Sequence, residues 1–114
     1  MLTLKALKDY GADVNEGMSR CMNNEAFYLR LVGMLRSDTH LKQLEDALSK
    51  NDLKAGFEAA HALKGVLANL AIKPVLIPVN QMTELLRSGE QADYQSMLAE
   101  AKEQMNRLLD LMQD

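Results

Sequence analysis

Apolar side chains recur at spacings of three and four residues along most of the chain, which is the period of one face of an α-helix. Only 2 prolines and 6 glycines interrupt the pattern in 114 residues. Strand-forming residues are sparse beside Leu, Ala, Met, Glu, Gln and Lys, which lose least on entering a helix. The pattern therefore predicts an all-α fold.

Short elements are expected in the first third of the chain. An opening segment covers residues 2–8. Asp13 and Glu16 resemble a capping pair at the start of the first clear helix. A second helix follows Asn24 and ends near Arg36, because its apolar residues keep the helical spacing over that range. We expect these elements to pack across one end of a larger assembly.

Longer elements follow at about 38–51, 52–73, 74–88 and 92–111. Either Ser37 or Asp38 caps the first of them. The third either kinks at Pro78 or begins near it, because proline lacks the N–H that an interior helical position donates. Short connectors favour antiparallel neighbours. The prediction is an antiparallel four-helix bundle with short additional N-terminal helices, forming one domain over residues 1–114.

Charge and composition exclude several classes of partner. The chain has 13 basic and 16 acidic residues and a net charge of −3, with no basic cluster that would bind nucleic acid. No apolar run approaches the roughly 20 residues that span a bilayer, so we expect no membrane insertion. Cys21 has no internal partner, and the chain does not start like a signal peptide. We expect a cytoplasmic monomer.

Methionine is abundant, with 8 residues in this chain, and most of them fall on the apolar faces. Flexible Met side chains fill irregular gaps in cores, and they also line binding grooves. We interpret them as core packing rather than as a binding surface.

His61 carries the clearest candidate chemistry. Its helix has an apolar face, and helical projection places His61 to one side of that face, where it flanks the core and reaches solvent. The unperturbed pKa of imidazole is about 6.5, so an exposed ring is largely neutral and has a nitrogen lone pair that can attack phosphorus. The residues on the same surface are Lys54, Glu58, Lys64, Gly65 and Ala68.

These neighbours suit an incoming anion and the protein that carries it. Lys64, and less directly Lys54, would stabilise the negative charge of a phosphorylated ring. Gly65 and Ala68 have little or no side chain, which lets another protein approach the nitrogen closely. Glu58 is a candidate for orienting the other ring nitrogen.

The segment from Ala60 to Gly65 reads Ala-His-Ala-Leu-Lys-Gly and is followed by Ala68-Asn69-Leu70. It resembles the phosphorylation helix of the histidine-containing phosphotransfer (HPt) domain family, which carries a His-x-x-Lys-Gly core. The resemblance extends over nearly the whole chain, because the neighbouring helices are where that family has them. Val66 and Ala71 depart from it, since small Ser and Gly residues are common there, and Pro78 is unusual in the following helix.

The resemblance implies a phosphorelay. Nε2 of His61 would accept a phosphoryl group from the aspartyl phosphate of a receiver domain and pass it to the aspartate of another. The implied partners are response-regulator receiver domains and a hybrid sensor histidine kinase. The receiver would supply Mg²⁺ and the catalytic apparatus, so the chain would be a phosphoryl carrier without a cofactor or metal of its own, and not an enzyme. We expect docking residues from the N-terminal helices, such as Leu2, Leu7 or Met18.

The rival interpretation is a helical-bundle adaptor that binds a partner without accepting phosphate, because a fold does not guarantee a function. An independent enzyme or metal centre is disfavoured, since the chain has 2 histidines, 1 cysteine and no HExxH, CxxC or Gly-rich phosphate loop. His40 has no neighbours comparable to those of His61, and we assign it no role. A labelled-phosphate assay separates the carrier from the adaptor.

Overall fold

The computed structural model describes residues 1–113, which fold into helices without any strand. The elements are α1 (Leu4–Tyr10), α2 (Val14–Arg20), α3 (Glu25–Gly33), the short 3-10 helix η1 (Met34–Ser37), α4 (His40–Ser49), α5 (Leu53–Leu70), α6 (Lys73–Arg87) and α7 (Tyr94–Asp110). This confirms the predicted all-α fold.

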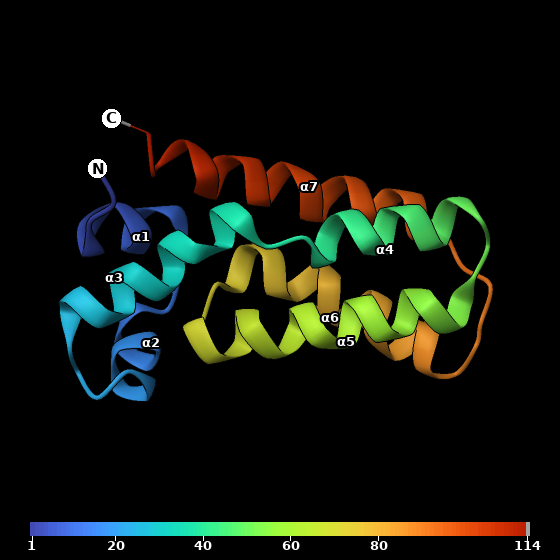
Figure 1. Ribbon diagram of the computed structural model, residues 1–114, viewed down its shortest axis with the longest axis horizontal. Coiled ribbons are helices and arrows are strands. Elements are labelled where there is room, and N and C mark those ends of the chain that lie inside the picture. Colours follow the sequence, from blue (N-terminus) through green and yellow to red (C-terminus); the bar gives the residue numbers. More distant parts are fainter. Residues whose placement is uncertain (114) are drawn as a thin grey trace.

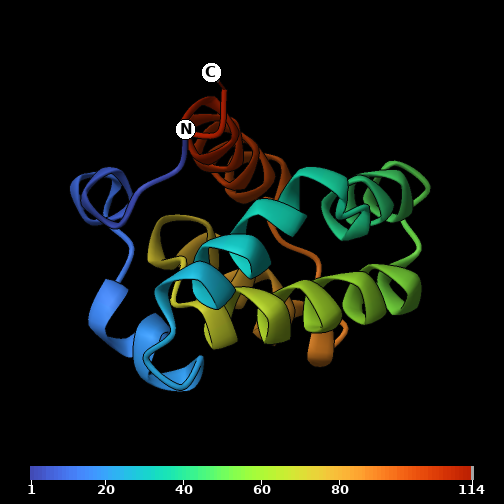
Figure 2. The same cartoon turned by 60° about the vertical axis from the view of Figure 1, so that its left-hand side comes forward.

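Helices α4 to α7 form the antiparallel four-helix bundle, and α1 to α3 gather at one end of it (Figure 1). Helix α5 packs mainly against α4 and α6, and α6 packs against α7. The turned view shows α2 and α3 beside the end of α5, where they contact it (Figure 2). The interior is filled by residues without exposed surface, among them Leu44, Leu63, Leu67, Val79, Met82 and Leu108.

The long helix α5 has clear signals at both ends. The Asp52 side chain accepts a hydrogen bond from the backbone N–H of Ala55, which caps the first turn. Ala71 follows the last turn with φ 57° and ψ 41°. Glycine usually adopts this left-handed conformation at a helix C-terminus, so Ala71 adopts it at a cost in backbone strain that a glycine would avoid.

Helix α6 begins at Lys73 and runs through Pro78, so the alternative start near Pro78 is wrong. Pro74 lies in the first turn, where a missing N–H costs little. Pro78 is buried inside the helix. The Thr83 hydroxyl donates to the backbone carbonyl of Val79 at 2.7 Å, which satisfies this buried polar group.

Two other boundaries differ from the sequence predictions. The second predicted helix ends at Gly33 and continues as the 3-10 turn η1. Neither Ser37 nor Asp38 caps α4, because Thr39 occupies the N-cap position. Asp38 instead accepts a hydrogen bond from the backbone N–H of His40 at 2.8 Å. Of the expected docking residues, Leu7 has no exposed surface, because α1 packs it into the core.

No helix among residues 1–113 is both long enough and apolar enough to cross a membrane. The longest of these helices, α5, has an apolar face toward the core and charged residues on its outer face.

Candidate functional site

His61 lies in the middle of α5, and its side chain is exposed. Its neighbours Ala60 and Leu63 have no exposed surface and anchor the opposite side of the helix in the core. This is the position that the helical period predicts. Within residues 1–113 neither ring nitrogen of His61 has a hydrogen-bond partner, and the ring stacks on Phe57 alone. The ring is therefore open to an incoming group.

One face of the His61 ring lies against Phe57, one helical turn earlier. The ring centroids are 5.4 Å apart and the planes meet at 17°, which is a stacked arrangement. Arg87 of α6 extends to the same aromatic ring, with its guanidinium carbon 5.1 Å from the Phe57 centroid. Phe57 thus links the histidine to a cation on the neighbouring helix.

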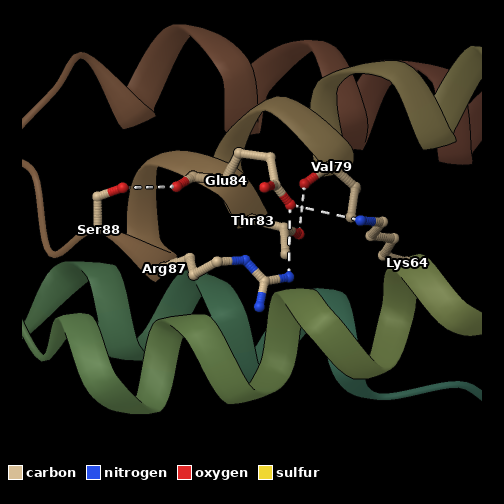
Figure 3. A network of polar contacts seen from close by, with 6 residues as sticks. All are labelled: Lys64, Val79, Thr83, Glu84, Arg87 and Ser88. Carbon is tan, nitrogen blue, oxygen red and sulfur yellow. Dashed lines mark hydrogen bonds and ion pairs between the residues drawn. The ribbon is translucent and has the colours of Figure 1, made fainter.

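Lys64 is the cation closest to His61 along α5, and it is paired. Its Nζ lies 3.4 Å from Oε2 of Glu84 on α6. The same oxygen is 3.5 Å from Nη2 of Arg87 (Figure 3). Hydrogen bonds from Arg87 and then Lys64 lower the pKa of the Glu84 carboxyl group, so it stays ionised at neutral pH. The ammonium group expected beside the histidine is therefore already paired with the Glu84 carboxylate.

The remaining predicted residues lie along the outer side of α5. A Cβ atom added to Gly65 would meet no atom within 4 Å, so the surface one turn after His61 is open. Ala68 is half-buried one turn further on. Lys54 and Glu58 are exposed, and the expected orienting contact from Glu58 to the ring is not formed. The open surface thus lies on the C-terminal side of the histidine.

An apolar groove of about 810 Å³ adjoins this open surface, between α5 and the segment formed by α3 and η1. Met34 forms part of its wall and is 62% exposed. The lining residues are Leu31, Met34, Leu35, Ser37, Asp38, Ala62, Gly65, Val66, Asn69 and Leu70. The expected docking residues Leu2, Leu7 and Met18 do not line this groove. The exposed Met34 shows that not every methionine is packed in the core.

Sequence reasoning did not find Phe57, Glu84 and Arg87 as parts of the site. The spacing of Phe57 and His61 by one turn was a usable signal for the stacked pair. Glu84 and Arg87 come from α6, and their approach to α5 depends on how the two helices pack. No local pattern reveals that approach. No group of three or more His, Cys, Asp or Glu side chains in residues 1–113 is arranged to hold a metal ion.

A family model described as Hpt domain matches residues 34–113, a range that begins with η1 and includes α4 to α7. The matched range contains His61 and its neighbours on both α5 and α6. No curated protein and no solved structure matches the chain.

Proposed function

The chain belongs to the Hpt domain family, and we therefore propose that it relays phosphoryl groups between receiver-domain aspartates through Nε2 of His61. Hpt domains are phosphocarriers rather than enzymes in the usual sense. The observation that carries the proposal is the exposed His61 ring, whose nitrogens accept or donate no hydrogen bond among the described residues 1–113, with open space beside Gly65. An acceptor approached by a second protein needs this accessibility.

The transfer needs only in-line placement and charge compensation. The lone pair on Nε2 of the neutral ring attacks the phosphorus of an aspartyl phosphate, and a P–N bond forms. The P–O bond to the aspartate breaks, and its electron pair stays on the released carboxylate. Nδ1 keeps its hydrogen, so the ring carries a positive charge that partly offsets the phosphoryl group. Transfer to a second aspartate reverses these steps.

The neighbouring residues support this reaction through charge and access. Lys64 lies one turn from His61 and can turn its ammonium group toward the phosphoryl oxygens. Lys54 adds positive charge from further along the exposed side of α5, and Glu58 adds negative charge at the edge of the site. Gly65 and Ala68 leave room for the receiver surface that surrounds its aspartate.

We assign the apolar groove beside Gly65 to docking of the receiver domain. It borders the turn that follows His61, so a partner seated there would bring its active site to the imidazole. Burial of its apolar lining would favour association, while the long side chain of Met34 can adapt to different partners. The proposed partners are response-regulator receivers and the receiver of a hybrid sensor histidine kinase, with Mg²⁺ bound in the receiver.

We place the reaction in the cytoplasm and propose that the chain acts as a monomer. His61 would supply the acceptor and the groove beside Gly65 a docking surface, so neither role calls for a second copy of the chain. The chain needs no bound cofactor for this role, because the receiver contributes the metal-dependent chemistry.

The test is phosphoryl transfer from a ³²P-labelled receiver to the wild-type chain, to His61→Gln and to His40→Gln. His40 is a matched control because it is the second imidazole of the chain and is held by Asp38 at 3.0 Å. The proposal expects acid-labile, base-stable label on the wild type and on His40→Gln, and none on His61→Gln. The adaptor interpretation expects receiver binding without label on any of the three proteins. That result would overturn the proposal.

A further inference from the structure

One carboxylate oxygen of Glu84 forms ion pairs with two cationic side chains in the site. Oε2 of Glu84 lies 3.4 Å from Nζ of Lys64 and 3.5 Å from Nη2 of Arg87. Figure 3 shows the carboxylate between the two cationic groups, one reaching it from α5 and the other from its own helix α6. In this state both cations are held by an anion of the domain itself.

The two cations differ in how directly they approach the histidine. Lys64 is one helical turn after His61 on α5. Arg87 lies over the Phe57 ring, and the Phe57 ring is stacked on the His61 ring. Lys64 and Arg87 both have long side chains, so each can turn from Glu84 toward a phosphoryl group on His61, Lys64 directly and Arg87 past the edge of the Phe57 ring. A phosphoryl group carries a larger negative charge than a carboxylate and more acceptor oxygens.

We propose that Glu84 is a competing anion that regulates the site, holding Lys64 and Arg87 while His61 is free and releasing them when it is phosphorylated. The proposal rests on phosphoryl transfer to His61. No covalent bond to Glu84 forms or breaks, because its role is an exchange of ion pairs. The side chains of Glu84, Lys64 and Arg87 are 53%, 32% and 50% exposed, so the pairs are weak enough to exchange readily.

The arrangement has a functional consequence for the direction of transfer. The Glu84 carboxylate repels the phosphoryl group and competes for its counter-charges, so it disfavours the phosphorylated state relative to the free state. A less stable phosphohistidine is a better donor to the next aspartate. Glu84 therefore limits how much phosphoryl group accumulates on the domain and promotes its onward transfer.

The test compares Glu84→Gln with Glu103→Gln, which is a matched control. Glu103 is an exposed carboxylate on α7 that lies 3.9 Å from Arg107, so its replacement removes the same charge and one exposed ion pair elsewhere. Each variant is equilibrated with ³²P-labelled receiver, and the ratio of phosphorylated to free domain is measured. Circular dichroism checks that the variants are folded.

Glu84→Gln is expected to raise this ratio roughly threefold to tenfold at low salt, with a smaller gain at high salt because exposed charges are screened. Glu103→Gln should match the wild type. The gain should shrink when Glu84→Gln is combined with Arg87→Gln, since one released cation is then missing. An unchanged or lower ratio in Glu84→Gln, or an equal rise in Glu103→Gln, would overturn this proposal while leaving transfer to His61 intact. A wild-type chain that takes no label would instead overturn the proposed function itself.

Discussion

Phe57 and His61 stack one helical turn apart, with their ring centroids 5.4 Å apart. The contact covers one face of the imidazole, the residue as a whole is exposed, and its nitrogens have no hydrogen bond in residues 1–113. An aromatic neighbour thus limits how far the ring can turn and does not consume its lone pair. A positioned but unbonded nitrogen is what an acceptor in phosphoryl transfer requires.

Replacement of Phe57 by Leu should slow phosphoryl transfer by about 2- to 10-fold, because stacked rings contribute about 0.5–1.5 kcal/mol beyond the area that they bury. Phe57→Tyr keeps the ring and should retain most of the rate. The measurement is single-turnover transfer from a phosphorylated receiver. Phe27→Leu is the control, since Phe27 is also half-buried and has an arginine, Arg30, 5.5 Å from its centroid. Equal rates for Phe57→Leu and Phe27→Leu would show that the stack does not position the histidine.

Substitutions of Gly65 should separate stability from function. Gly65→Ala is expected to raise the free energy of unfolding by about 0.5–1 kcal/mol, because the site is helical and an added Cβ meets no atom within 4 Å. Gly65→Leu should also fold, yet it fills the space that a receiver would enter. We expect it to slow transfer at least tenfold, a rough figure for a displaced acceptor. Denaturant titration measures the stability and transfer kinetics measure the function. Transfer by Gly65→Leu at the wild-type rate would show that open space beside His61 is not required.

Gly17→Ala should have the opposite effect on stability. An added Cβ would lie 2.5 Å from Cε1 of Tyr28, a ring without exposed surface whose hydroxyl donates to the Leu70 carbonyl at 2.9 Å. The ring must shift and strain or lose this hydrogen bond, so we expect destabilisation by about 1–3 kcal/mol despite the better helix propensity of alanine. Thermal unfolding measures the change. A melting temperature at or above that of the wild type would contradict the close packing of α2 on Tyr28.

A charge in the groove should weaken docking without changing the acceptor. Met34→Asp places a carboxylate on a wall residue that is 62% exposed, so the domain should keep its stability while receiver affinity falls about tenfold. Met22→Asp is the control, because Met22 is 79% exposed and does not line the groove. Titration calorimetry with a receiver gives the affinities. Labelling of His61 by phosphoramidate, a donor that needs no docking, should be equal in both variants. Unaltered affinity in Met34→Asp would place docking elsewhere.

The sequence predicts those features of this protein that depend on helical period. The exposure of His61 and the burial of Leu63 follow from one projection of α5, and the four-helix bundle follows from helix lengths and short connectors. The arrangement of Glu84 and Arg87 around the site does not follow, because it depends on the packing of α6 against α5. The burial of Leu7 could not be predicted either, because it depends on which helices pack against α1.

Local competition explains the errors at helix boundaries. Asp38 has the side chain of a good cap, but it bonds the backbone and the ring of His40, and Thr39 takes the N-cap position. Pro78 reads as a helix breaker, yet α6 continues through it because the surrounding apolar residues are buried in the bundle. Tertiary packing thus outweighs a local preference at this position.

The most direct test of the account is ³¹P nuclear magnetic resonance of the wild-type chain after incubation with a phosphorylated receiver and Mg²⁺. We predict one phosphoramidate resonance that correlates with the imidazole protons of His61 through Nε2 and is lost in His61→Gln. A chain that shows no P–N resonance, or one that carries it on His40, would contradict the central claim.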